Sequence, residues 1–490
     1  MMLLSSMGRA LKLSPNNTIS TNAIGEPMKR IAAILLLLLV TSILDIFGQD
    51  RYFVEFIDKT GTEHTLQNPS TYLSPKSIER RRRQSIGINE IDLPVSEAYV
   101  RHIRQLGVEV VFTSKWLNGA VIKNATSKQI RQLQKKEWIK NVLLIYDSKV
   151  KGTPTPDFTT YTAYRAANDS SNFYNYGPAM EQVAMVNGQD LHNLGFRGKG
   201  MTIAVLDGGF YKANILPVFD SLWTNQRVVF EKDVVDPESN LYQQNSHGMF
   251  VLSVLGANVN GLMVGTAPEA DYALIRCEDT YSEQVIEEYY WAKAAELADS
   301  LGVDIINSSL GYYEYDAPWQ SLSYNQLDGK TTPIARAASI AAQLGMLVVV
   351  SAGNEAITEW RHIISPADAH NCIAVGAVNA KGKVSSFSSI GPTSDGRIKP
   401  DVVALGENTV VQTTEGEIGT ADGTSLAAPI VSGFAACLWQ ALPHLTAKEI
   451  SEIIIQSASQ HNAPNNRLGH GVPNFLKALE ASKQEKGFKP

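Results

Sequence analysis

Four polar residues spread along the chain have side chains suited to nucleophilic catalysis, in the order Asp207, His247, Asn354 and Ser425. A serine hydroxyl is a weak nucleophile until a neighbouring base accepts its proton, and an imidazole titrates near neutral pH. A carboxylate can orient that imidazole, and an amide can donate a hydrogen bond to the oxyanion of acyl transfer. The chemistry that these residues suggest is therefore acyl transfer to a serine.

Ser425 lies in the motif DGTSLAAPIVSG, which spans Asp422–Gly433 and opens an apolar helix predicted to run toward Ala441. At a helix N-terminus, the dipole and the free backbone N–H groups stabilise negative charge. This environment suits a serine nucleophile, whose intermediate carries an oxyanion beside it. Taken alone, the motif fits an ordinary N-cap serine equally well.

The other three residues also adjoin apolar runs. Asp207 follows Ile203–Leu206, a run between glycines that predicts a buried parallel strand. Open α/β sheets place catalysts at the carboxyl ends of such strands. His247 precedes the apolar run Met249–Leu255, and Asn354 ends the strand-like segment GMLVVVSAGN. Singly, each residue also fits a structural role, such as starting a turn.

Together the four motifs resemble those of the subtilisin-like serine proteases (subtilases). The order Asp, His, Ser is that of subtilisin and differs from the orders in chymotrypsin and in α/β-hydrolases. The resemblance implies that Asp207 orients His247, that His247 is the general base, that Ser425 is the nucleophile and that Asn354 donates to the oxyanion.

The likeness extends over roughly Leu191–Leu479 and includes weaker landmarks. The segment DIINSSLG is similar to a strand and turn that lie beside the substrate in this family. The resemblance implies that an extended peptide is bound there as an added strand. The substrate-binding residues that it implies are Ser309, Leu310, Gly311 and Gly353.

The sequence departs from the commonest family motifs at four positions. Gly208 and Gly209 follow the aspartate, where Ser or Thr is most common, and Met249 and Phe250 follow the His-Gly pair. None of these positions carries a proton-transfer or nucleophilic group, so the departures bear on specificity. By resemblance, Glu355 lies near the rim of the primary pocket and would favour basic or large side chains.

Three other interpretations fit parts of the sequence. The segment Gly423–Ala427 is one residue from a nucleophile elbow, but that fold needs an acid and then a histidine after the serine. It would leave Asp207 and His247 without a role. A catalytically inactive binding protein with a subtilase fold is disfavoured because all four chemical residues are present. The third interpretation is a processing protease of narrow specificity, which the sequence does not distinguish from a protease of broad specificity.

The predicted fold is α/β: a subtilisin-like three-layer fold with a mostly parallel central sheet, preceded by a small α+β ferredoxin-like propeptide. The predicted divisions are an N-terminal extension with a signal peptide (1–48), an inhibitor-like propeptide (49–148), a linker and maturation region (149–190), the peptidase catalytic domain (191–480) and a charged tail (481–490).

The propeptide prediction rests on the order of strand and helix patterns. RYFVEFI predicts a strand, VSEAYVRHIRQLG a helix, VEVVFTSKWLNGAVI two strands, TSKQIRQLQKKEWI a helix and KNVLLIY a strand. This βαββαβ order is that of a ferredoxin-like unit, and it is similar to the inhibitory propeptides of subtilases. An insertion at Asn68–Leu93 contains Arg80–Arg83, which is interpreted as a solvated charged helix in preference to a processing site.

The segments around this module predict processing and export. Residues 149–176 lack periodicity, which favours a surface loop where a zymogen cuts itself. Lys29 and Arg30 precede the apolar run Ile31–Leu44 and the small Gly48, a pattern typical of a secretory signal. Met28 is then the expected start. The expected location is secreted, periplasmic or extracellular, and an uncleaved signal anchor is the alternative.

The composition of the chain limits the classes of binding partner to be expected. The net charge of −6 gives no electrostatic footprint for nucleic acid, so the expected partners are peptide or protein substrates and the chain's own propeptide, with the enzyme a monomer. Cys277, Cys372 and Cys437 fit buried thiols, with one disulfide left open. Catalysis is expected to need no cofactor. Structural calcium is common in the family, but the sequence assigns no metal ligands.

Overall fold

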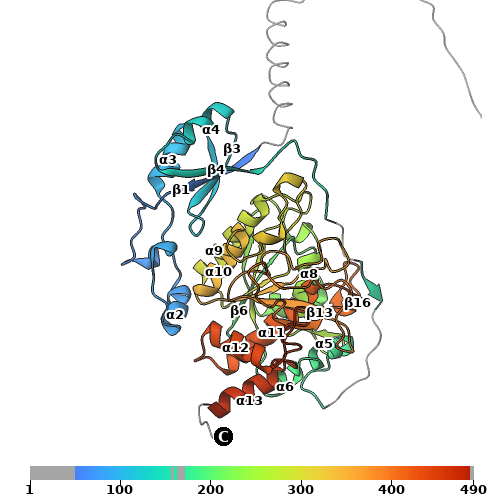
Figure 1. Cartoon of the computed structure of the whole chain (residues 1–490). Coiled ribbons are helices and arrows are strands. Elements are labelled where there is room, and N and C mark those ends of the chain that lie inside the picture. Colours follow the sequence, from blue (N-terminus) through green and yellow to red (C-terminus); the bar gives the residue numbers. More distant parts are fainter. Residues whose placement is uncertain (1–49, 156–158, 163–170, 486–490) are drawn as a thin grey trace, which may run out of the picture. The chain divides into compact units, whose positions relative to one another are not determined.

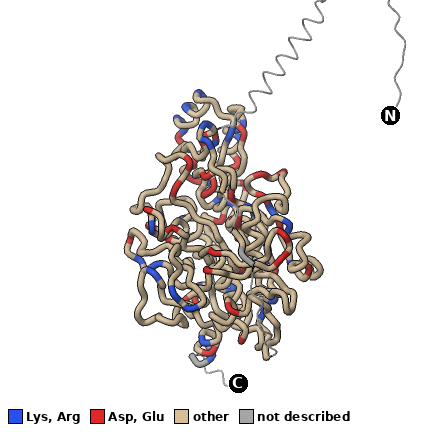
Figure 2. Tube along the Cα trace, turned by 90° about the vertical axis from the view of Figure 1, so that its right-hand side faces the viewer, with Lys and Arg blue, Asp and Glu red and all other residues tan. Residues whose placement is uncertain are grey.

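The computed structural model describes residues 50–155, 159–162 and 171–485. The predicted signal segment lies outside these residues, so its prediction stays as stated. Along the described trace, Lys and Arg are interspersed with Asp and Glu (Figure 2).

A seven-stranded sheet forms the centre of the C-terminal part (Figure 1). All its neighbouring strands pair in parallel, so their carboxyl ends lie along one edge. Pairing sets Arg276 opposite Asp207 and Ser308 opposite Leu206, which brings three strand ends together. In sheet order the strands are β14 (Val402–Leu405), β13 (Ile373–Val378), β12 (Leu347–Ser351), β11 (Ile305–Ser308), β6 (Thr202–Asp207), β10 (Asp271–Arg276) and β7 (Val228–Asp233).

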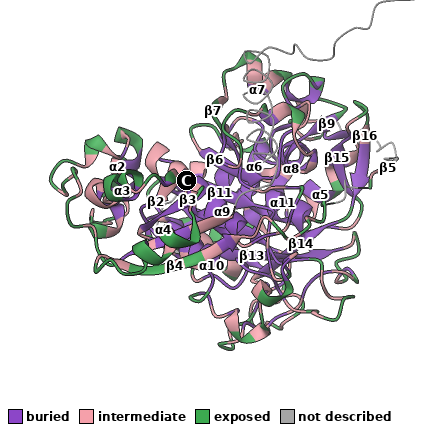
Figure 3. Cartoon of the chain, turned by 90° about the horizontal axis from the view of Figure 1, so that it is seen from above, coloured by how far each residue is buried: buried purple, intermediate pink, exposed green. Residues whose placement is uncertain are grey.

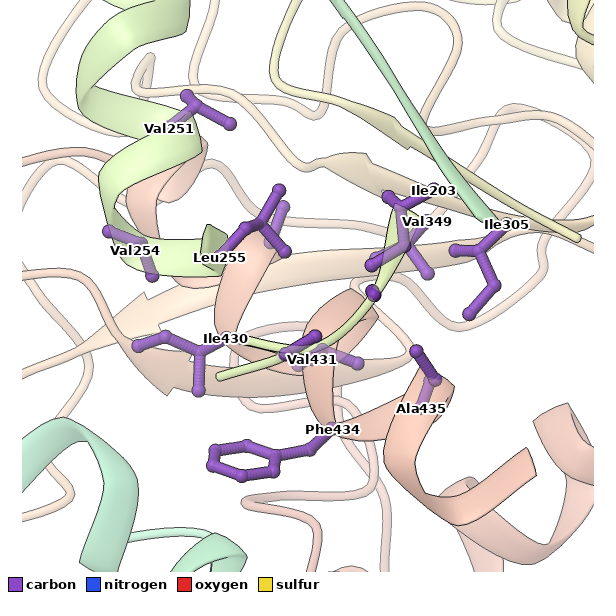
Figure 4. Close-up of a cluster of buried hydrophobic side chains, with 14 of the residues drawn as sticks. Ile203, Val251, Val254, Leu255, Ile305, Val349, Ile430, Val431, Phe434 and Ala435 are labelled. Atoms are coloured by element: carbon purple, nitrogen blue, oxygen red, sulfur yellow. The ribbon is translucent and has the colours of Figure 1, made fainter. Parts of the chain in front are cut away.

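Helices pack on both faces of this sheet, and the alternation of side chains along β6 shows how. Ile203 and Val205 belong to a core cluster with α8 (His247–Gly256) and α11 (Thr424–Ala441). Ala204 and Leu206 point to a second cluster with α9 (Ile286–Leu301) and α10 (Pro333–Gln343). Figure 4 shows side chains of α8 and α11 meeting those of the strands, and Figure 3 shows the buried residues concentrated there. The predicted three-layer α/β fold is confirmed.

Smaller elements complete the C-terminal part. The helices are α5 (Met180–Ala184), α6 (Gly188–Asn193), α7 (Asp220–Thr224), α12 (Ala447–Ser457) and α13 (Phe475–Glu485). The strands are β5 (Tyr161–Thr162), β8 (Asn258–Val259), β9 (Met263–Val264), β15 (Thr409–Gln412) and β16 (Ile418–Ala421).

Helix α11 is the one described helix that is long and apolar enough to cross a membrane, judged by length and composition. The structure buries 89% of it inside the protein, as expected for the central helix of a core. The three cysteines are likewise buried, and all are free thiols without a disulfide.

Residues 50–148 form the N-terminal module, a four-stranded antiparallel sheet in the order β2-β3-β1-β4. This is the strand order of a ferredoxin-like fold, which confirms the predicted βαββαβ pattern. The elements are β1 (Arg51–Phe56), α2 (Pro75–Arg83), α3 (Glu97–Gln105), β2 (Glu109–Ser114), β3 (Gly119–Lys123), α4 (Ser127–Leu133) and β4 (Ile139–Tyr146). Helix α2 comes from the predicted insertion.

The two faces of the module's sheet have different partners. Val54 and Phe56 pack in a cluster with α3 and α4. Phe53 and Val121 point the other way and share a cluster with α9 and α10. The carboxylate of Glu296 on α9 accepts hydrogen bonds from the Ser114 hydroxyl at 2.5 Å and from two backbone N–H groups of the turn after β2. The module therefore packs on α9 through both apolar and polar contacts.

The interpretation of Arg80–Arg83 as a solvated charged helix is wrong for its first half. The side chains of Arg80 and Arg81 are 0% and 1% exposed, and both reach the buried carboxylate of Asp299 on α9 at 2.6 and 2.7 Å. Lys115 joins them at 2.8 Å. Burial alone would raise the pKa of Asp299, but these three cations hold it well below its ordinary value. A run of four arginines has no apolar periodicity, so the sequence does not indicate which side is buried.

The Arg80 guanidinium also donates to the Val303 carbonyl at 2.6 Å. We expect Arg80→Ala to lower the free energy of unfolding of the full chain by about 3–5 kcal/mol, because it breaks a buried ion pair and also removes the buried donor to the Val303 carbonyl. Denaturant titration measures this loss. The matched control is Arg82→Ala on the same helix, whose side chain is 73% exposed and pairs with Glu79. Its expected cost is about 0–1 kcal/mol. Equal losses for the two variants would contradict the buried role of Arg80.

Candidate active site

Asp207 and His247 meet at the carboxyl edge of the sheet. Asp207 is the last residue of β6 and is fully buried, and His247 is the first residue of α8. The Nδ1 atom of His247 lies 2.7 Å from Oδ1 of Asp207, and the same oxygen accepts the Gly208 N–H at 2.8 Å. A carboxylate bonded to Nδ1 fixes the tautomer that leaves Nε2 as the base.

Glycine at position 248 makes this contact possible. A Cβ on Gly248 would lie 2.3 Å from the Gly209 carbonyl oxygen and 2.8 Å from Cβ of Asp207. Any side chain would therefore push α8 away from the end of β6. The two departures after the histidine, Met249 and Phe250, are buried in the core on α8, so their apolar character follows from their position.

The electrostatic surroundings favour a protonated imidazole. Burial by itself lowers the pKa of His247, but the charge and hydrogen bond of Asp207, with the nearby charge of Glu278, outweigh it. The pKa of His247 therefore lies above its ordinary value.

Glu278 is a residue that the sequence analysis missed. It follows Cys277 at the end of β10, beside β6, and a Cβ on Gly208 would lie 2.5 Å from its Oε2 atom. The glycine after the aspartate thus leaves room for this carboxyl group. Burial and the charge of Asp207 raise the pKa of Glu278 to about 7, against the opposing charges of His247 and Arg276. The available signal was an acidic residue just beyond the strand-like run Asp271–Arg276.

Ser425 is the second residue of α11, and its hydroxyl is buried without a hydrogen-bond partner in the described part of the chain. The N-cap position belongs to Gly423, so the N-cap interpretation of Ser425 is wrong. Pro429 lacks an N–H and leaves the Ser425 carbonyl without its usual helical partner. The Ser309 hydroxyl donates to that carbonyl at 2.7 Å.

Asn354 follows β12 and is oriented by the residue before Ser425. Its Oδ1 atom accepts the N–H of Thr424 at 2.9 Å and the Thr424 hydroxyl at 3.0 Å. Because the amide oxygen is engaged with these donors, the amide nitrogen is the group left to donate. The Gly353 N–H in turn donates to the Thr424 hydroxyl at 3.1 Å. Thr424 was not singled out from the sequence, since a Thr before Ser is common in turns.

The four predicted substrate-binding residues lie on two neighbouring strand ends. Ser309, Leu310 and Gly311 continue β11; the first two are buried, and the latter two make no hydrogen bond with the described part of the chain. Gly353 has φ +106°, and a Cβ there would come within 2.9 Å of Ile364. The backbone groups of Leu310 and Gly311 are therefore not used in pairing within the described part of the chain.

The segment after the N-terminal module runs beside the residues that follow β10. The Thr155 N–H donates to the Thr280 carbonyl at 2.9 Å, and the Thr153 N–H donates to the Asp316 carboxylate at 3.1 Å. A Cβ on Gly152 would lie 2.3 Å from the Tyr281 carbonyl oxygen. Residues 152–155 thus lie against the segment that follows Glu278. Glu355, which the sequence was expected to place near the rim of the primary pocket, accepts a hydrogen bond from the Tyr313 hydroxyl at 3.1 Å.

Two family models match this chain. The model of the subtilase family matches residues 198–471, and the model of the Bacteroidota peptidase S8 propeptide domain matches residues 51–157. The solved structure of MycP1 from Mycobacterium smegmatis has a TM-score of 0.50 and 22% identity, and covers 67% of this chain and 90% of that chain. This likeness concerns the fold.

Two curated relatives are similar in sequence. Serine protease AprX from Bacillus subtilis (strain 168) is 30% identical over 297 residues, which are 55% of this chain and 62% of AprX, less than two thirds of its length. Subtilisin NAT from Bacillus subtilis subsp. natto is 30% identical over 303 residues, which are 61% of this chain and 70% of that protein. The chain therefore belongs to the subtilase family of serine-type endopeptidases, with a peptidase S8 propeptide domain ahead of the peptidase domain.

Proposed function

We propose that the chain is an exported zymogen that hydrolyses peptide bonds within protein substrates through Asp207, His247 and Ser425. The observation that carries the proposal is the 2.7 Å contact between Asp207 and His247, at the strand edge that Ser309 links to the backbone of Ser425. An inactive binding protein would have no need of this arrangement. Export rests on the basic and apolar pattern at Lys29–Leu44.

In the proposed reaction, the Ser425 hydroxyl attacks the scissile carbonyl while Nε2 of His247 accepts its proton. Asp207 stabilises the imidazolium through Nδ1. The oxyanion accepts hydrogen bonds from the Ser425 N–H and from the amide nitrogen of Asn354, whose orientation Thr424 fixes. His247 then protonates the leaving amine, and water resolves the acyl-enzyme by the same steps. Among the described residues the Ser425 hydroxyl has no hydrogen-bond partner, as is common when catalytic hydrogen bonds tighten only in the complex.

The substrate is proposed to bind as an extended strand. Leu310 and Gly311 offer backbone groups on one side, and Thr280 accepts the N–H of Thr155 on the other. Backbone pairing of this kind supplies affinity without strict dependence on sequence.

The N-terminal module is proposed to inhibit the peptidase domain until it is cut away. Supporting this, residues 152–155 lie against the same segment that a substrate would use. A cut within the predicted maturation segment, after Thr155, would free that segment for substrates. A tail that occupies a substrate edge before cleavage is already aligned for attack by the enzyme's own serine.

We expect Ser425→Ala to abolish labelling by a fluorophosphonate probe and peptide hydrolysis, with the fold retained by circular dichroism. The control is Ser432→Ala on the same helix, whose hydroxyl donates to Asn307 and takes no part in the proposed reaction. Asn354→Ala should keep labelling but lower kcat by about 10²–10³, the effect of losing one such donor in subtilisin. Unchanged labelling of Ser425→Ala would refute the assignment.

The rate of peptide hydrolysis should rise with pH as His247 loses its proton, because a protonated imidazole cannot accept the serine proton. Since the pKa of His247 is raised, the midpoint in kcat/KM should lie above the unperturbed value of about 6.5, and activity should be lost as pH falls through it. A pH profile with a slow amide substrate measures this. A flat profile between about pH 5 and about pH 8, with chemistry rate-limiting, would contradict the role of His247.

The purified precursor should lose its N-terminal module by a cut between Thr155 and Tyr176, because that stretch follows the docked tail and lies ahead of α5, the first α-helix of the C-terminal part. Intact mass and N-terminal sequencing locate the cut. Ser425→Ala should remain whole in the absence of other proteases. Maturation of this variant to the same N-terminus in isolation would mean that an outside protease does the cutting.

A further inference from the structure

Gly311 and Gly353 face one and the same side chain from two neighbouring strand ends. Gly311 follows β11 and Gly353 follows β12, and both are among the predicted substrate-binding residues. A Cβ on Gly311 would lie 2.6 Å from Cγ1 of Ile364, and a Cβ on Gly353 would lie 2.9 Å from the same atom. The Ile364 side chain therefore occupies the gap into which a side chain on either glycine would point.

Hydrogen bonds to both strand ends hold the backbone at Ile364 in place. Its N–H donates to the Ala352 carbonyl at 3.1 Å, on the β12 side. On the β11 side, Ser365 pairs with Tyr312 through two backbone hydrogen bonds of 2.8 and 3.1 Å. The Ile364 side chain is 8% exposed, and a side chain branched at Cβ has few rotamers open to it. Withdrawal of this side chain from the gap would therefore require the backbone to move.

The catalytic groups indicate which substrate residue lies at this gap. In the proposed reaction the scissile carbonyl must reach both the Ser425 hydroxyl and the amide nitrogen of Asn354. Asn354 directly follows Gly353, so the substrate residue that carries this carbonyl lies beside Gly353. With the extended peptide also paired to the β11 end, the side chain of that residue is directed between the two glycines.

The carboxylate of Glu355, next to Asn354, is already engaged by its surroundings. It accepts the Tyr313 hydroxyl at 3.1 Å, and the Tyr313 ring stacks on that of Trp360 with centroids 4.7 Å apart. Burial and the charge of Glu355 raise the pKa of Tyr313, so the hydroxyl keeps its proton and remains a donor. A charged substrate side chain would have to compete with this contact.

We infer that Ile364 limits the substrate residue before the scissile bond to a small side chain, such as that of Gly, Ala or Ser. The inference rests on the proposed function, because it takes the peptide to bind along these two strand ends. A large side chain would overlap Ile364, and overpacking a filled site is unfavourable. This preference differs from the one for basic or large side chains that was expected from Glu355.

The test compares matured enzymes on the peptides succinyl-Ala-Ala-Pro-X p-nitroanilide, in which X is Ala, Leu, Phe or Lys. Active sites are counted by fluorophosphonate labelling. With the parent enzyme, kcat/KM for X = Ala should exceed that for Phe or Lys by at least about tenfold, since one misfitting methylene in an apolar pocket is worth about 10–200-fold. Ile364→Ala should raise kcat/KM for Leu and Phe, relative to Ala, by at least about tenfold.

Two further variants separate the size of the gap from general packing. Ile364→Val removes one methylene, keeps the branching at Cβ and should shift the same ratios in the same direction by less, which keeps the test open if Ile364→Ala fails to fold. The matched control is Ile363→Ala. Ile363 is fully buried in the cluster with α9 and α10, so this variant loses core packing but should leave the substrate ratios unchanged.

The result that contradicts the inference differs from the result that contradicts the proposed function. An enzyme that neither reacts with the probe at Ser425 nor cleaves any of the four peptides would refute the proposed function. If Ser425 is labelled, three results would overturn the role of Ile364: no cleavage of the X = Ala peptide, a parent preference for Phe or Lys, or ratios that both Ile364 variants leave unchanged. A preference for Lys would assign specificity to Glu355 instead.

Discussion

The contact between helix α8 and the end of strand β6 is the constraint on which the active site depends. The backbone at Gly248 approaches Asp207 so closely that a Cβ would overlap the neighbouring carbonyl. A similarly close approach occurs on α11, where a Cβ on Gly433 would lie 1.9 Å from the Thr266 hydroxyl. Two buried helices can thus lie tightly against one face of the sheet. Close packing of this kind fixes polar groups to within fractions of an ångström, which flexible side chains alone do not achieve.

Much of this arrangement could be predicted because it follows from local patterns of apolar residues in the sequence. The run Ile203–Leu206 indicates a buried strand, and parallel strands bring their ends to one edge, so Asp207 could be assigned to that edge from the sequence. The ferredoxin-like module was equally accessible, since each of its elements has a clear period. The resemblance to the family motifs then indicated which residues are candidates for catalysis. The hydrophobic periods of the strands and helices alone do not indicate this.

The residues that escaped prediction act through contacts distant in sequence. Arg80 looked like part of a solvated basic helix, and only the position of Asp299 on α9 explains its burial. Thr424 orients Asn354 across 70 residues of chain. Glu278 gains its surroundings from strand order, because β10 lies next to β6 in the sheet. Each side chain obeys ordinary chemistry, but its partner is set by topology and not by neighbours in the sequence.

The attachment of α2 to α9 has a consequence for how activity would appear over time. The N-terminal module is held at two separate places, by the sheet on α9 and α10 and by the arginines on Asp299. Once the linker is cut, the module is no longer covalently attached to the peptidase domain. Its two contacts would then act like those of a bivalent ligand: when one contact opens, the other keeps the module at a high local concentration. Under the proposed processing, release would be governed by the lifetime of the complex and not by the scission itself. The inserted helix would then delay activity until the cut module dissociates.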